Sequence, residues 1–86
     1  METIWKYPIK ITDHQDVSMP SGAVALTVQM QAGALTLWAL VNPDAPTEPR
    51  RVRVIGTGHP CNVEAFDYVG SVQDRAFMWH VFIERD

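Results

Sequence analysis

The sequence lacks the features that mark several specialised classes of protein. It contains one cysteine, Cys61, which excludes an internal disulfide. No apolar run approaches the ~20 residues of a transmembrane helix, and residues 1–10 lack the apolar segment of a secretory signal. We therefore expect a cytoplasmic protein that does not insert into a membrane.

A surplus of positive charge is also missing. Seven Lys and Arg residues stand against ten Asp and Glu residues, and the formal net charge is −3. Non-specific binding to DNA or RNA needs an excess of cations to displace the counterions of the phosphates. Nucleic acid is therefore not expected to be the main partner.

What the sequence does contain is apolar residues that recur at a period of two. A chain of 86 residues is expected to form a single domain, residues 1–86, with one core. Alternation of apolar and polar residues predicts β-strands, and no window keeps a helical period. The predicted strands cover residues 5–11, 17–19, 24–30, 35–41, 50–55, 68–73 and 76–84. Seven short strands with turns at this spacing predict an all-β fold, a small antiparallel β-sandwich or partly open barrel.

The first predicted strand has the features of a sheet edge. Pro8 cannot donate a backbone hydrogen bond, which places the strand at an edge, and Lys6 and Lys10 disfavour pairing with a further strand. Its apolar odd positions, from Trp5 to Ile11, are predicted to form one buried face.

Two connections also have clear signals. A short loop that contains Gly33 joins residues 24–30 to residues 35–41, and we predict Gly33 in the left-handed region as part of a G1-type bulge. Residues 42–49, NPDAPTEP, hold three prolines and are predicted to form a stiff surface loop.

Two predicted strands are apolar on both faces, although a small sandwich buries only the inner face of each sheet. The second faces predict an interface formed by Trp38, Leu40, Met78, His80 and Phe82. Because large exposed apolar patches are rare on monomers, these faces need a cover. The cover is either the monomer's own Pro-rich loop and N-terminal arm, a second copy in a homo-oligomer, or a different partner.

The segment IGTGHP, residues 55–60, is the one dense cluster of glycines. Its backbone N–H groups can hold an anion with help from neighbouring arginines. The weak ligand site predicted in this way consists of Arg51, Arg53, Gly56, Thr57, Gly58 and His59. No Lys-Ser/Thr pair and no helix follow the glycines, as a phosphate-binding loop would require. A β-corner whose glycines relieve steric crowding is the favoured interpretation.

Catalytic and metal-binding signatures are thin. His59, Cys61 and Glu64 lie close in sequence, but a zinc site needs three or four convergent ligands, and a catalytic cysteine needs a positioned base. We therefore predict no catalytic residue, no metal and no cofactor. His80 lies within an apolar strand, which favours a hydrogen-bonded histidine of the core or of an interface.

Several segments together resemble a family of small proteins encoded by bacteriophages and prophages. They are IWKYPIKITD at the start, VQMQAGALTLWALVNPDAP in the centre, the GTGHP block, YVGSVQ, and WHVFIE near the end. The resemblance extends over nearly the whole chain and implies a phage accessory protein in the cytoplasm of the infected bacterium. It implies no catalytic residues.

These observations favour a protein that is not an enzyme and that binds stoichiometrically to a host or defence protein, or to itself. The chief alternative is sequestration of a small anionic ligand, such as a signalling nucleotide, at the glycine corner. A further alternative is a minor structural protein of the virion.

Overall fold

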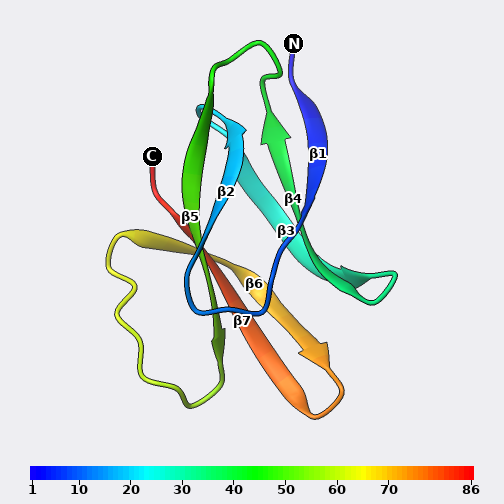
Figure 1. Cartoon of the computed structure of the whole chain (residues 1–86), viewed down its shortest axis with the longest axis vertical. Helices are drawn as coiled ribbons and strands as arrows, with labels where there is room; N and C mark the ends of the chain where they lie inside the picture. The colour runs from blue at the N-terminus through cyan, green and yellow to red at the C-terminus, as the bar shows by residue number, and fades with distance from the viewer.

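The computed structural model describes all 86 residues, which form seven β-strands and no helix. The strands are β1 (Thr3–Pro8), β2 (Gln15–Pro20), β3 (Val24–Gln31), β4 (Ala34–Val41), β5 (Thr47–Gly56), β6 (Phe66–Asp74) and β7 (Phe77–Glu84). They form two antiparallel sheets, one in the order β1-β4-β3 and one in the order β2-β5-β7-β6 (Figure 1). The predicted all-β sandwich is confirmed, and the sheets do not close into a barrel. The chain has no helix that can span a membrane.

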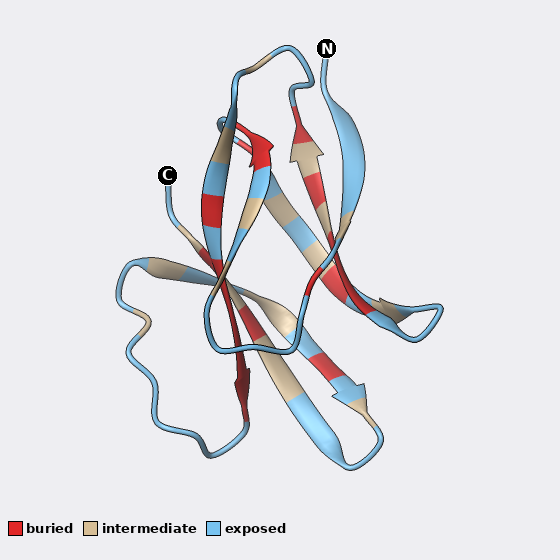
Figure 2. Ribbon diagram, viewed as in Figure 1, coloured by how far each residue is buried: buried red, intermediate tan, exposed pale blue.

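The core lies between the two sheets, because alternate residues of each strand point to the same side. In β4 the inward residues are Leu35, Leu37, Ala39 and Val41, and all four are buried. Their counterparts in the larger sheet include Val52, Val54, Val81 and Ile83. Figure 2 shows buried residues mostly within the strands, and most residues of the connections are exposed, apart from the buried Ile9 and Ala23.

The first strand lies at a sheet edge, as predicted, but its buried face is shorter than predicted. Strand β1 ends at Pro8, and the chain then crosses to the other sheet, where the Val54 amide donates to the Thr12 carbonyl. Trp5 and Ile11 are 42% and 43% exposed. Tyr7 and Ile9, in the middle of the predicted face, pack in or against the core, whereas Trp5 and Ile11 lie at its two ends. The period of two reports which side chains share a side of the chain, but not how far other parts of the fold cover that side.

The tight turn between β3 and β4 differs from the predicted G1-type bulge. Gln31 pairs with Ala34, so the loop has two residues, Ala32 and Gly33, with φ values of 50° and 80°. Two positive φ values in a two-residue loop define a type I′ turn, which matches the right-handed twist of the strands. Gly33 is in the left-handed region, as predicted.

The predicted Pro-rich loop is shorter than residues 42–49, because β5 already begins at Thr47. The first half of β5 pairs with β2 and its second half pairs with β7, and Val52 is the one residue that pairs with both. Ser21 donates to Pro46, so by alternation along the ladder the nitrogen of Pro49 points away from β2. No strand pairs with Pro49 on that side, and its missing donor therefore costs no ladder hydrogen bond.

Candidate functional site

The outer face of the smaller sheet carries a contiguous set of apolar side chains, here called the three-stranded face. Its members are Ile4, Val24, Leu26, Trp38 and Leu40. Ile4, Leu40 and Val24 lie in one row across the three strands. Ile4, Val24 and Leu26 are 56%, 54% and 47% exposed, whereas apolar side chains on soluble proteins are normally scattered singly.

A hollow of about 320 Å³ lies on the three-stranded face. Its lining is Ile4, Leu26, Trp38, Thr27 and Gln29. The apolar members provide the desolvated floor that a buried side chain of a partner needs, and the two polar members can accept or donate hydrogen bonds beside it.

A β-bulge in β3 creates part of this face. Ala25 pairs with Ala39 and Thr27 pairs with Trp38, so Leu26 is an extra residue between them. The sequence pattern places Val24, Leu26, Val28 and Met30 on a single face. The bulge instead turns the first two outward and leaves the last two facing the core. No glycine or proline lies near Leu26 to indicate the bulge, so sequence reasoning missed Val24 and Leu26 as surface residues.

The outer face of the larger sheet, here called the four-stranded face, is organised around His80. The hydroxyl of Thr57 lies 2.7 Å from His80 Nε2, and the hydroxyl of Tyr68 lies 2.9 Å from His80 Nδ1. Tyr68 also packs edge-on against Phe82, with ring centroids 5.1 Å apart. The predicted hydrogen bonding of His80 is confirmed, since both of its ring nitrogens have a partner, and its role at an interface stays a prediction.

The five residues predicted to form one interface are divided between these two faces. Trp38 and Leu40 belong to β4 in the smaller sheet, and Met78, His80 and Phe82 belong to β7 in the larger one. Because β4 and β7 belong to the two different sheets that enclose the core, their outward residues point to opposite sides of the sandwich. A single partner surface does not reach both sets.

The arginines of the predicted ligand site do not converge on the glycine corner. Arg53 is 6% exposed, and its guanidinium donates to Asp13 Oδ1 from Nε at 3.1 Å and from Nη2 at 2.8 Å. It also donates to the Asn62 carbonyl and lies over the Phe66 ring. Arg51 is exposed and lines a separate hollow with Asp16 and its neighbours. Arg53 therefore holds the β1–β2 connection, through Asp13, and the β5–β6 connection, through Asn62, against the sheet. Its guanidinium is not available to a ligand.

The glycine corner is a close-packed turn. A Cβ on Gly56 would lie 3.2 Å from Trp79 Cζ3 and 3.3 Å from His59 Cε1, and Gly58 has a φ of 88°. Gly56, Thr57 and His59 line a hollow of about 240 Å³ with the segment Ala76–Trp79, and its lining includes no arginine or lysine. This geometry supports the β-corner interpretation, because the two glycines solve steric problems.

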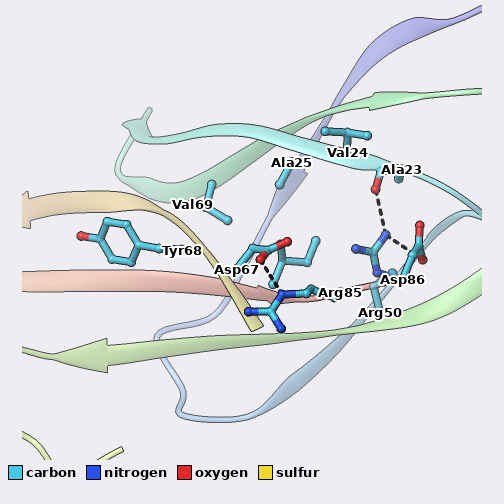
Figure 3. A pocket seen from close by; sticks show the side chains of 10 residues that line it. Ala23, Val24, Ala25, Arg50, Asp67, Tyr68, Val69, Arg85 and Asp86 are labelled. Carbon is cyan, nitrogen blue, oxygen red and sulfur yellow. Dashed lines mark hydrogen bonds and ion pairs between the residues drawn. The ribbon is translucent and has the colours of Figure 1, made fainter. Parts of the chain in front are cut away.

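Two other arginines, Arg50 and Arg85, line a cavity of about 220 Å³ between β3 and the β6–β7 pair (Figure 3). Arg50 donates to the Ala23 carbonyl at 2.8 Å and to the Glu84 carbonyl at 2.6 Å, and it lies 3.6 Å from Asp86.

The second arginine of this cavity is also paired. Arg85 Nε donates to Asp67 Oδ1 at 2.7 Å (Figure 3). Two guanidinium groups beside two carboxylates leave the cavity without a surplus of positive charge. The arrangement joins strands from both sheets and does not form an anion site. Sequence reasoning gave Arg85 no role, because no motif surrounds it.

Reactive groups are sparse elsewhere. Cys61 is a free thiol on the surface, and no three His, Cys, Asp or Glu side chains are placed to hold a metal ion. His59 packs on Gly56, so the three residues that lie close in sequence near Cys61 do not form a ligand set.

Comparison with known proteins gives one family and no relative of assigned activity. No curated protein and no solved structure matches the chain. One family model, described as "Domain of unknown function (DUF7352)", matches residues 1–86. Its match covers the full length of the sandwich, and the chain belongs to this family.

Proposed function

We propose that the protein acts by stoichiometric, non-catalytic binding to another protein, through the three-stranded face. The supporting observation is the exposure of three aliphatic side chains, Ile4, Val24 and Leu26, together with the hollow that Ile4 and Leu26 line beside Trp38. Binding energy at protein interfaces concentrates in a few aromatic and aliphatic anchors that lose contact with water. The three-stranded face supplies such anchors, and the two polar residues of the hollow supply its rim.

The partner in this proposal is a host or defence protein of a bacterium. The resemblance of the IWKY start and the GTGHP block to phage and prophage proteins supports a phage accessory protein that works in the cytoplasm of the infected cell. A small domain that binds and blocks its target needs no catalytic group, which agrees with the sparse chemistry of its surface.

The test compares affinity capture from infected cells by the wild type and two variants. Leu26→Lys places a charge at the rim of the hollow, and Ile11→Lys places the same charge on an exposed apolar residue outside the face. We expect the wild type and Ile11→Lys to recover one protein in stoichiometric amount, and Leu26→Lys to lose it at least tenfold. Recovery of no specific protein, or equal recovery by all three, would overturn the proposal.

The two alternatives raised by the sequence have separate signatures. Sequestration of a signalling nucleotide predicts a rise in melting temperature with cyclic nucleotides or ADP-ribose derivatives, because a ligand that binds only the folded state stabilises it. A virion component would be found in purified particles. Either result, together with a failed capture, would replace the proposed function.

A further inference from the structure

Strand β1 offers a second way to bind protein, through its backbone. It is the first strand of the smaller sheet, and β4 is its only neighbour. Five of its six residues are exposed, and it is pale blue for most of its length in Figure 2. A free edge of this kind carries unpaired N–H and C=O groups, which are a template for another strand.

The hydrogen-bond ladder shows which residues carry these free groups. The Ile9 amide donates to the Leu35 carbonyl at 2.9 Å, in the same register that pairs β1 with β4. Because antiparallel residues bond alternately to one side and the other, the odd residues of β1 bond to β4. The backbone groups of Glu2, Ile4 and Lys6 therefore point outward, and so does the nitrogen of Pro8, which has no hydrogen to donate.

We infer that β1 pairs antiparallel with β1 of a second copy, with Ile4 on the two-fold axis. In this register Glu2 lies opposite Lys6 of the partner subunit, and Lys6 lies opposite Glu2 of the partner subunit. All outward groups of the three residues are then paired, which gives about six backbone hydrogen bonds. Pro8 lies beyond the paired stretch, so its missing donor costs nothing.

The two neighbouring registers of the β1–β1 pair are less favourable. Centring the pair on Lys6 brings two like charges face to face, which destabilises a sheet. Centring it on Trp5 gives no more hydrogen bonds, because Pro8 leaves one group unpaired at each end, and it places Lys6 opposite Ile4 of the partner subunit, so the attraction between Glu2 and Lys6 is lost. Lys6 thus disfavours the other registers and selects the one centred on Ile4. Because Glu2 and Lys6 are complementary in this register, we identify the strand that pairs with the edge as β1 of a second copy of this chain.

The pairing also joins the two three-stranded faces. Two three-stranded sheets become one six-stranded sheet, and Ile4 of each copy meets at its centre. On the other side of the new sheet, the exposed Trp5 lies opposite Thr3 of the partner subunit. The expected homo-oligomer is thus a two-fold dimer, and this inference goes beyond the proposed function without depending on it.

A charge exchange tests the register on the purified protein. Lys6→Glu replaces two attractive cross-strand pairs with two repulsive ones, and Glu2→Lys with Lys6→Glu restores them in exchanged form. By analytical ultracentrifugation we expect the single variant to dissociate about tenfold more readily and the double variant to recover wild-type association. Lys10→Glu changes the net charge equally outside the paired stretch and should leave association unchanged.

A cross-link provides an independent readout of the two-fold axis. In a Cys61→Ser background, Ile4→Cys places two thiols opposite each other and should give a disulfide-linked dimer on mild oxidation. Thr3→Cys, whose opposite residue is Trp5 of the partner subunit, should not. A wild type that stays monomeric at every soluble concentration, or a dimer that Lys6→Glu leaves unchanged, would overturn the inference. Since no other protein is present, failure here is distinguishable from failure of the capture experiment.

Discussion

Tyr7 is a residue whose ionisation is altered by its surroundings. Its ring packs against the core from the inner side of β1, and its hydroxyl is buried without a hydrogen-bond partner. Burial raises the pKa of the Tyr7 phenol above its ordinary value, because the phenolate would lose its hydration. The residue thus combines favourable apolar packing with an unsatisfied polar atom.

Tyr7→Phe keeps the ring and removes that atom. We expect the free energy of unfolding at neutral pH to stay the same or to rise by about 1 kcal/mol. The raised pKa has a second consequence, because the unfolded chain releases this proton first as the pH increases. Stability from the neutral phenol is therefore fully present below about pH 10 and is lost as the pH rises through the folded-state pKa.

Urea unfolding near pH ~8 and near pH ~11, bracketing the ordinary tyrosine pKa, measures this difference. Tyr7→Phe should lose less stability than the wild type between the two conditions. Equal losses would show that the Tyr7 hydroxyl does not contribute to the alkaline destabilisation.

At the scale of the element, the strands change neighbours, bulge and turn at particular residues. Strand β5 changes neighbours along its length, and Val52 is the position that pairs with both β2 and β7. Strand β3 contains the bulge at Leu26, and the β3–β4 turn requires two left-handed residues in succession. Only the second of those two, Gly33, is a glycine.

Ala32→Asn should stabilise the β3–β4 hairpin. Ala32 has a φ of 50°, which is strained for alanine, whereas asparagine adopts this region more readily and Asn-Gly is the preferred type I′ pair. We expect the free energy of unfolding to increase by about 0.5–1 kcal/mol. The measurement is urea unfolding, whose midpoint should move to a higher urea concentration.

Gly33→Ala provides the opposite control within the same turn. A Cβ on Gly33 would meet nothing within 4 Å, so any loss reports only the cost of a φ of 80°. We expect a loss of about 1–2 kcal/mol. A stabilising Gly33→Ala, or a destabilising Ala32→Asn, would contradict the type I′ assignment.

The whole molecule is thin, with extents of 39 × 30 × 16 Å. Two stacked sheets account for this short dimension, since packed sheets lie about 10 Å apart. A two-layer domain of this size has large outer faces relative to its core. Both proposed binding modes use this exposed outer surface. One uses the side chains of the three-stranded face, and the other uses the backbone of β1.

Hydrogen exchange should map this organisation. Leu37, Ala39 and Val81 lie in the fully buried centre and should exchange only with global unfolding. In dilute solution the amides of Ile4 and Lys6 should exchange fast, because they point outward from the edge strand. At concentrations that favour the dimer, the same two amides should become protected.

Trp5 supplies the reference within the same strand, because its amide bonds to β4. Amide exchange followed by NMR should find Trp5 slower than Ile4 in dilute protein. Equal rates for the two residues would contradict the assigned orientation of the edge.

The strands and the edge position of Pro8 could be predicted from sequence, because both depend on local properties. A period of two indicates which side chains of a strand share a face. A proline has no N–H to donate, so it indicates an edge where a further strand is not expected to pair. The β-corner at Gly56 was likewise indicated by its composition. The exposure of Leu26 could not be predicted, because no residue type marks the bulge that turns it outward. The pairing of Arg53 could not be predicted either, because its partner Asp13 is distant in sequence.

The all-β class and the approximate positions of the seven strands follow from the sequence, because alternation and turn chemistry act between neighbours along the chain. The tertiary structure alone decided which strands share a sheet. That decision separated Trp38 from Phe82, placed Ile4 beside Leu40 and Val24, and left the edge of β1 open. Strand pairing depends on hydrogen bonds between residues far apart in sequence, and no local pattern specifies them.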